Sequence, residues 1–171
     1  MTEQAESEFI TITLGKFEVT GGHIGAWDPC YEVGGRHASF MPSRPAVNGT
    51  WEVSLLWVDG FPALLEAHSV RHRATGKRLR KIGVAEVDSG IIGIYDVAQV
   101  PDVHFAMSEV GVGQGLMTWG AYTSTAFGDG AYEVKGRPNA EGKLVSVQVE
   151  VMDLRLLKAL QARAESPPNS L

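Results

Sequence analysis

The chain has 171 residues, of which 44% are hydrophobic and 20% charged, a composition typical of one globular domain with a buried core. Its formal net charge of -5 excludes a general electrostatic attraction to nucleic acid or to an anionic membrane, and no apolar run is long enough to span a bilayer. The single cysteine, Cys30, excludes an intramolecular disulfide and favours a reducing compartment, so we expect a cytoplasmic protein.

Most of the chain reads as short strands separated by turns, as its 20 glycines indicate. Residues 9–14 alternate with the period of a strand, and Gly15–Lys16 is expected to turn them into the next one. Residues 34–49 are expected to be a loop, because glycine and proline punctuate them. The predicted strands are, in chain order, 9–14, 17–20, 50–58, 77–87, 90–97, 103–110, 115–123, 130–135 and 143–151.

Two segments depart from the plain strand pattern. Residues 61–72 fit either a helix after Pro62 or a strand, and we favour the strand because 74–76 look like a hairpin loop. Asp153 is a good N-cap for the one predicted helix, which carries an apolar stripe and stops before Pro167.

The sequence therefore predicts an all-β fold, either a β-sandwich or a partly open barrel with mostly antiparallel strands, and one C-terminal helix. We expect a flexible N-terminus over 1–8, a single β-rich domain over 9–165 whose helix covers 153–165, and a flexible tail over 166–171.

Aspartates provide the first candidate site. Asp88, Asp96 and Asp129 could bind a divalent cation through carboxylate oxygens or act as an acid/base pair, with Asp28 as a fourth acid. On one straight strand, Asp88 and Asp96 would lie about 26 Å apart, too far to share an ion. The favoured interpretation is that Asp88-Ser89-Gly90 is a turn or a glycine bulge, and that Gly128-Asp129-Gly130 is a second turn.

Histidine and cysteine provide weaker candidates. His68 and His72 would share a helical face and could ligate zinc, but on a strand they would lie about 13 Å apart. Cys30, with His23 or His37 as a base, could act as a nucleophile, although a lone cysteine near aromatic residues usually packs as a small apolar group.

Six of the 15 Lys and Arg residues form a basic patch within 71–81. A hairpin carrying them could bind phosphates, or the charges could keep a sheet edge from pairing with another chain. The acidic total charge favours edge protection. The patch consists of Arg71, Arg73, Lys77, Arg78, Arg80 and Lys81.

Two glycine-acid motifs carry a family resemblance. These are Val87-Asp88-Ser89-Gly90 with Asp96, and Phe127-Gly128-Asp129-Gly130-Ala131-Tyr132-Glu133-Val134 followed by Gly136-Arg137 and Gly142; Asp28-Pro29 accompanies them. The sequence resembles the bacterial family designated domain of unknown function four-two-four-one, over roughly residues 9–153. The resemblance implies a compact β-rich cytoplasmic protein of bacterial or phage origin. It implies no activity, substrate or cofactor.

Three functional hypotheses follow. The leading one is a protein without catalytic activity that binds a protein partner or itself, because no complete catalytic constellation is recognised. The second is a site on Asp88, Asp96 and Asp129 that binds a small ligand or a divalent metal, and that could also catalyse hydrolysis. The third is nucleic-acid binding through the hairpin of 71–81, against which the net charge argues. No cofactor is predicted apart from that divalent cation.

Overall fold

The computed structural model describes residues 8–31, 42–100 and 113–152. Within these ranges the chain forms eleven strands and no helix, so the predicted all-β class is confirmed. The predicted helix of 153–165, the tail of 166–171 and the predicted strand of 103–110 lie outside the described residues. The strands are β1 Phe9–Val19, β2 His23–Trp27, β3 Ser43–Pro45, β4 Gly49–Val58, β5 Phe61–Ser69, β6 Arg80–Val87, β7 Ile91–Asp96, β8 Gln114–Met117, β9 Gly120–Ser124, β10 Gly130–Pro138 and β11 Leu144–Glu150.

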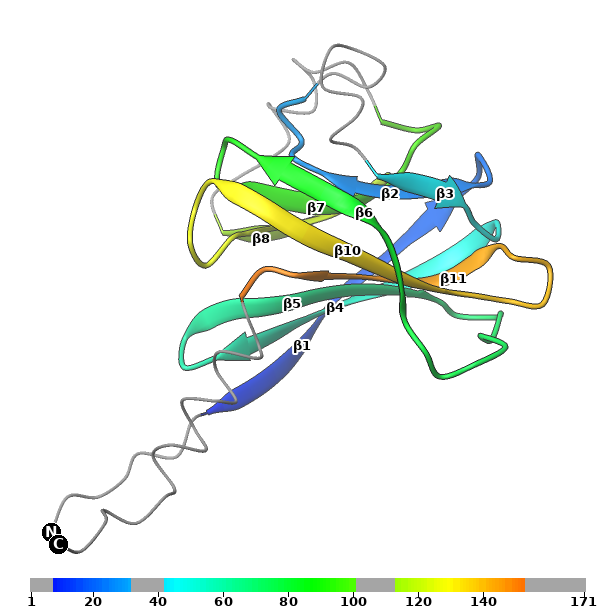
Figure 1. Ribbon diagram of the computed structural model, residues 1–171, viewed down its shortest axis with the longest axis horizontal. Helices are drawn as coiled ribbons and strands as arrows, with labels where there is room; N and C mark the ends of the chain where they lie inside the picture. Colours follow the sequence, from blue (N-terminus) through cyan, green and yellow to red (C-terminus); the bar gives the residue numbers. More distant parts are fainter. Residues whose placement is uncertain (1–7, 32–41, 101–112, 153–171) are drawn as a thin grey trace, which may run out of the picture.

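The strands form two sheets. Sheet A has the order β1-β4-β5-β11-β10-β6, and sheet B has the order β3-β2-β7-β9-β8. The strand pairs of both sheets are antiparallel, and an isolated parallel bridge joins Ala46 to Leu144. Figure 1 shows β2, β3 and β7 of sheet B in one layer and β1, β4 and β5 of sheet A in another. The chain crosses between the sheets after β1, β3, β6 and β9.

The main core lies between the sheets. Trp51, Val53 and Leu55 of β4 are fully buried there, as the alternation of that strand predicts, and Ile92 and Ile94 of β7 face them from sheet B. Trp57, predicted on the same face, is only half-buried, but it still packs against this core. The register with β5 shifts next to it, between Leu56 and Trp57, and the extra residue of that bulge is Ala63 on β5.

Three strand predictions need correction. Residues 9–19 form one strand, because Gly15 produces a bulge opposite β4 and not a turn. The segment predicted as one strand over 115–123 is a hairpin of β8 and β9. The predicted loop of 34–49 contains β3, which pairs with β2 along its short length. The favoured strand interpretation of 61–72 is confirmed over 61–69.

Glycines and aromatic rings alternate on the outer face of sheet B, the face turned away from the main core. In cross-strand register Tyr95 lies opposite Gly25 and Gly120, Gly93 lies opposite Trp27 and Tyr122, and Gly115 also lies opposite Tyr122. Each ring has room to lie over the backbone because its neighbour lacks a Cβ atom. These strand glycines therefore accommodate rings, whereas the composition suggested that glycines would mark turns.

The ring packing predicts a large effect for Gly93→Ala. An added Cβ would lie 2.0 Å from the Tyr95 hydroxyl and 2.5 Å from the Ala121 carbonyl oxygen, and the carbonyl belongs to a paired strand that cannot move away freely. We expect the free energy of unfolding, measured by urea denaturation, to fall by about 1–3 kcal/mol. Gly76→Ala is the control, because no atom lies within 4 Å of its added Cβ. Equal stability of the two variants would contradict the packing argument.

Candidate functional site

The described residues contain no helix long and apolar enough to cross a membrane. They also contain no group of three or more His, Cys, Asp or Glu side chains that could hold a metal ion.

Asp96 is fully buried at the end of β7, and its carboxylate holds the crossing from β1 to β2. It accepts hydrogen bonds from the Thr20 backbone N–H at 2.7 Å, the Thr20 hydroxyl at 3.0 Å and the Gly21 N–H at 3.4 Å. The Gln99 amide and the Ala98 N–H donate at 2.7 and 3.2 Å. Burial alone would raise the pKa of Asp96, but these hydrogen bonds outweigh it and hold the pKa below its ordinary value.

Asp28 is the second fully buried carboxylate, and it holds the crossing from β6 to β7. It accepts hydrogen bonds from the Asp88 N–H at 2.9 Å and from the Ser89 N–H and hydroxyl, both at 2.8 Å. The Cys30 N–H donates to it at 2.8 Å. The predicted turn at Asp88-Ser89-Gly90 is confirmed, with Gly90 at φ 69°. However, the carboxylate that caps the turn comes from Asp28 and not from Asp88.

Asp88 and Asp129 lie at one corner of the molecule, and Asp96 does not join them. Both are exposed, and Val87 pairs with Gly130 across β6 and β10, so the two acids follow adjacent strand ends. These acids also affect the Tyr31 phenol. Burial raises its pKa, and the negative charges of Asp28, Asp88, Glu86 and Asp129 raise it further. The structure thus brings together two of the three predicted aspartates.

The histidine and cysteine candidates have local partners. His68 faces Glu52 at 3.9 Å between Nε2 and the carboxylate, whereas Nδ1 of His72 lies 3.1 Å from the Ser69 hydroxyl. Burial raises the pKa of the Cys30 thiol, and the charge of Asp28 raises it further. The thiol is therefore protonated at neutral pH, which makes it a poor nucleophile. His37, one of its proposed bases, lies outside the described residues.

The basic patch lies on the connection from β5 to β6 and on the first residues of β6. Arg80 and Lys81 belong to β6, which is an edge strand of sheet A, and this position agrees with edge protection. The other four cations, Arg71, Arg73, Lys77 and Arg78, lie before the strand begins and are exposed. Edge protection therefore accounts for the placement of two of the six cations.

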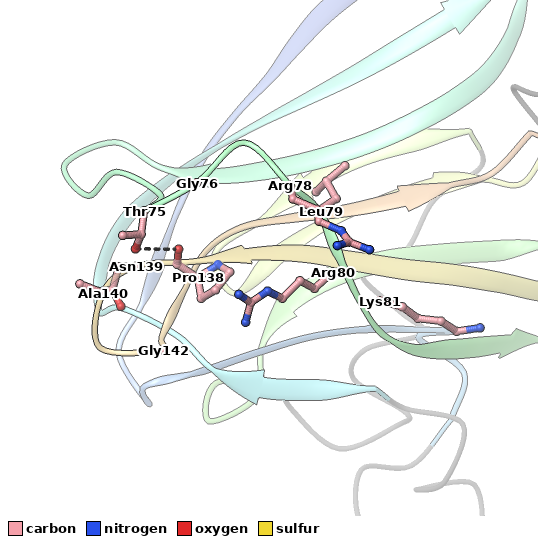
Figure 2. Close-up of a pocket in the computed structure, with 10 residues that line it drawn as sticks. All are labelled: Thr75, Gly76, Arg78, Leu79, Arg80, Lys81, Pro138, Asn139, Ala140 and Gly142. Carbon is pink, nitrogen blue, oxygen red and sulfur yellow. Dashed lines mark hydrogen bonds between the residues drawn. The ribbon is translucent and has the colours of Figure 1, made fainter.

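A hollow of about 830 Å³ lies between this connection and the turn from β10 to β11 (Figure 2). We call it the basic groove. Its ten lining residues include three cations and no carboxylate: Thr75, Gly76, Arg78, Leu79, Arg80, Lys81, Pro138, Asn139, Ala140 and Gly142. Figure 2 shows the Arg80 side chain extending toward Pro138, while Lys81 points away from it.

Hydrogen bonds fix both walls of the basic groove. The Thr75 N–H donates to the Pro138 carbonyl at 3.1 Å and ties the connection to the end of β10. On the other wall, the Asn139 side-chain oxygen accepts from the N–H groups of Glu141 and Lys143, both at 3.0 Å. Gly142 closes that turn at φ 80°. The turn was predicted from the sequence, but its approach to Thr75 had no sequence signal.

Five of the six patch cations have no ion pair among the described residues. Lys81 pairs with Glu133 at 3.1 Å, but Arg71, Arg73, Lys77, Arg78 and Arg80 have no carboxylate within salt-bridge distance in the described ranges. The sequence 71–81 contains no Asp or Glu, so no local acid neutralises it. These charges are available to an external anion.

No family model, curated protein or solved structure matches the chain. The resemblance to family four-two-four-one therefore stays a prediction. The motifs that suggested it are nevertheless neighbours in space: Asp28 caps the turn at Asp88–Ser89, and an added Cβ at Gly90 would lie 3.7 Å from the Gly128 Cα.

The lowered pKa of Asp96 predicts a pH-dependent contribution to stability. Because the folded pKa lies below the unfolded value near 3.8, the ionised carboxylate stabilises the fold above that pH. Its contribution is lost as the pH falls through the folded pKa. We expect Asp96→Asn to lower the free energy of unfolding by about 2 kcal/mol at neutral pH, and the gap from the parent chain to narrow in acid.

Urea unfolding of both chains at pH 7 and near pH 3 measures this gap. Asp129→Asn is the matched control and should unfold at the urea midpoint of the parent chain at both pH values, because Asp129 is exposed. A gap between Asp96→Asn and the parent chain that stays constant with pH would show that the carboxylate charge is not the source of the stabilisation.

Proposed function

We propose that the protein acts by binding, and that the basic groove holds the sugar-phosphate backbone of a nucleic acid. The observation that carries the proposal is a hollow of about 830 Å³ lined by Arg78, Arg80 and Lys81 and by no carboxylate. Phosphate groups bind where several cations and hydrogen-bond donors converge, and their binding releases condensed counterions. The single cysteine agrees with a reducing cytoplasm, in which we place this binding.

The lining of the basic groove favours binding without sequence preference. It contains no aromatic side chain, so bases have no ring on which to stack. Its polar groups are two guanidinium groups, an ammonium group, a hydroxyl and an amide, all of which suit phosphate oxygens. We therefore propose that the basic groove contacts the sugar-phosphate backbone and makes no sequence-specific contacts with the bases.

The proposal predicts a steep dependence of affinity on salt. Two phosphate contacts with a single strand, from Arg78 and Arg80, give a slope of log affinity against log salt of about −1.4, so affinity falls about sevenfold between about 50 and 200 mM salt. Fluorescence anisotropy with a labelled single-stranded oligonucleotide of mixed sequence measures the slope. Arg78→Gln with Arg80→Gln should weaken binding about tenfold or more and bring the slope close to zero.

Arg44→Gln is the matched control for this experiment. Arg44 is exposed on β3 of sheet B, does not line the basic groove and has no ion pair among the described residues. Its loss removes the same charge at a different place. If Arg44→Gln reduced affinity as much as a single change in the basic groove, the attraction would be non-local and the proposal would fail. Absence of binding at low salt would exclude it outright.

Self-association is a second candidate function, favoured by the contrast between the two edges of sheet A. The β6 edge carries Arg80 and Lys81, whereas β1 carries no charge from Phe9 to Gly15. Phe9 and Ile10 are 52% and 46% exposed. An uncharged edge with exposed apolar side chains is suited to pairing with another strand. We propose a second copy of β1 as the partner.

Thr11→Lys tests this pairing, because Thr11 is an exposed residue in the uncharged part of β1. We expect the parent chain to sediment as a dimer and the variant as a monomer, since a lysine on the edge opposes strand addition. Thr118→Lys, an exposed position between β8 and β9, should leave the dimer intact. A parent chain that sediments as a monomer at high concentration would exclude this candidate.

A further inference from the structure

A second hollow, of about 500 Å³, lies beyond the contact between Thr75 and Pro138 that bounds the basic groove. Figure 2 draws that contact as a dashed line from the Thr75 hydroxyl to the Pro138 oxygen. The residues next to it in sequence, Ala74 and Arg137, line the second hollow. We call this hollow the Arg137 pocket. The two hollows are thus adjacent at the end of β10.

Arg137 has a side-chain donor that the fold does not satisfy. Its Nε atom is buried and has no hydrogen-bond partner. Its guanidinium group also has no ion pair among the described residues. An unpaired charged donor that has lost its water destabilises the folded chain, and such a group in a native protein requires an explanation. An anion in the pocket, which Arg137 lines, would pair with the charge of this guanidinium group.

The other polar groups of the Arg137 pocket are suited to an anion. Cross-strand register places Arg137 opposite Ser146, and Ser146 opposite His68 on the next strand. Arg73 adds a second unpaired guanidinium from the connection, and Ser69 contributes a hydroxyl that lies 3.1 Å from His72 Nδ1. The lining thus presents two cations, two imidazoles and two hydroxyls on one concave surface.

One carboxylate lies in the same lining. Glu66 accepts a hydrogen bond from the Ser146 hydroxyl at 3.5 Å and makes no ion pair with Arg137 within the described ranges. With both histidines neutral, two guanidinium groups still outnumber it. A ligand that accepts from several donors at once satisfies this lining better than a single carboxylate does, and a phosphomonoester offers three terminal oxygens.

We propose that the Arg137 pocket binds a phosphomonoester, and that its physiological form is the terminal phosphate of a strand lying in the basic groove. The inference rests on the proposed function for the identity of the strand, but not for the chemistry of the pocket. A terminal phosphate has one more ionisable oxygen than an internal phosphodiester, so it can accept from more of the donors that line the pocket at once.

Matched oligonucleotides test the proposal. Two strands of one mixed sequence, ending in a 5′-phosphate or a 5′-hydroxyl, are compared by anisotropy, and inorganic phosphate alone is titrated by calorimetry. We expect the phosphorylated strand to bind about tenfold more tightly, since charge-assisted hydrogen bonds are gained only with the terminal phosphate. A 3′-phosphorylated strand is included, and preference for either phosphorylated end supports the proposal.

Arg137→Met assigns the preference to the pocket. The variant keeps an unbranched apolar stem but removes the unsatisfied donor, so we expect it to unfold at an unchanged or higher urea midpoint in phosphate-free buffer. It should lose the preference for phosphorylated ends while keeping the affinity for the hydroxyl-ended strand. Arg71→Met is the matched control, because it removes one charge from the neighbouring connection between β5 and β6 without lining the pocket, and it should retain the preference.

The outcomes separate this proposal from the proposed function. Equal binding of phosphorylated and hydroxyl-ended strands would overturn the pocket proposal and leave the basic groove in place. Failure of every strand to bind, with inorganic phosphate still bound in an Arg137-dependent way, would overturn the groove and support the pocket. If neither the strands nor phosphate binds, both proposals fail. A preference that persists in Arg137→Met would place the phosphate elsewhere and overturn the pocket assignment.

Discussion

Two buried carboxylates hold the chain where it crosses between the sheets, and the arrangement of the sheets depends on them. Asp96 ends a strand of sheet B and binds the backbone of Thr20 and Gly21, which leads out of sheet A. Asp28 follows another strand of sheet B and binds the turn by which β6 of sheet A leads to β7. At each crossing, backbone N–H groups lose their partners in the sheet, and the carboxylate accepts their hydrogen bonds instead. A backbone N–H that is buried without a partner destabilises the fold. The aspartates that first suggested chemistry therefore include two that serve connectivity.

Charge on sheet A is divided between paired and unpaired groups. Lys135 bridges Glu150 at 2.8 Å and Glu133 at 3.2 Å, and Lys81 reaches the same Glu133 from the edge strand. The hydrogen bonds from these two lysines lower the pKa of Glu133. These charges satisfy one another, whereas the arginines of the connection before β6 have no such partners among the described residues. The difference separates cations that stabilise the sheet from cations that remain open to a ligand.

The sequence predicted the elements better than it predicted the neighbours of each element. Alternation identified β4 and β5, and turn residues identified the turns at Ser89–Gly90 and Asn139–Gly142, because these signals are local. The hairpin of β8 and β9 was missed because the Thr118-Trp119 turn lacks the usual glycine or proline at its centre. The capping of the turn at 88–89 by Asp28 joins residues 60 or more positions apart, and the Arg137 pocket requires three adjacent strands. No periodicity encodes such contacts, so the basic patch was visible in the sequence while its groove was not.

The acidic net charge argues against an anionic ligand, but the location of the basic patch in the fold weakens that argument. The six patch cations are included in the total of -5, so the remainder of the chain is more acidic than the total suggests. At physiological salt, however, exposed charges separated by more than about 8 Å are largely screened from one another. A ligand within the basic groove therefore responds to the unpaired Arg78 and Arg80 far more than to acids elsewhere on the surface. Total charge governs the long-range approach of a partner, whereas the local lining governs what remains bound after contact.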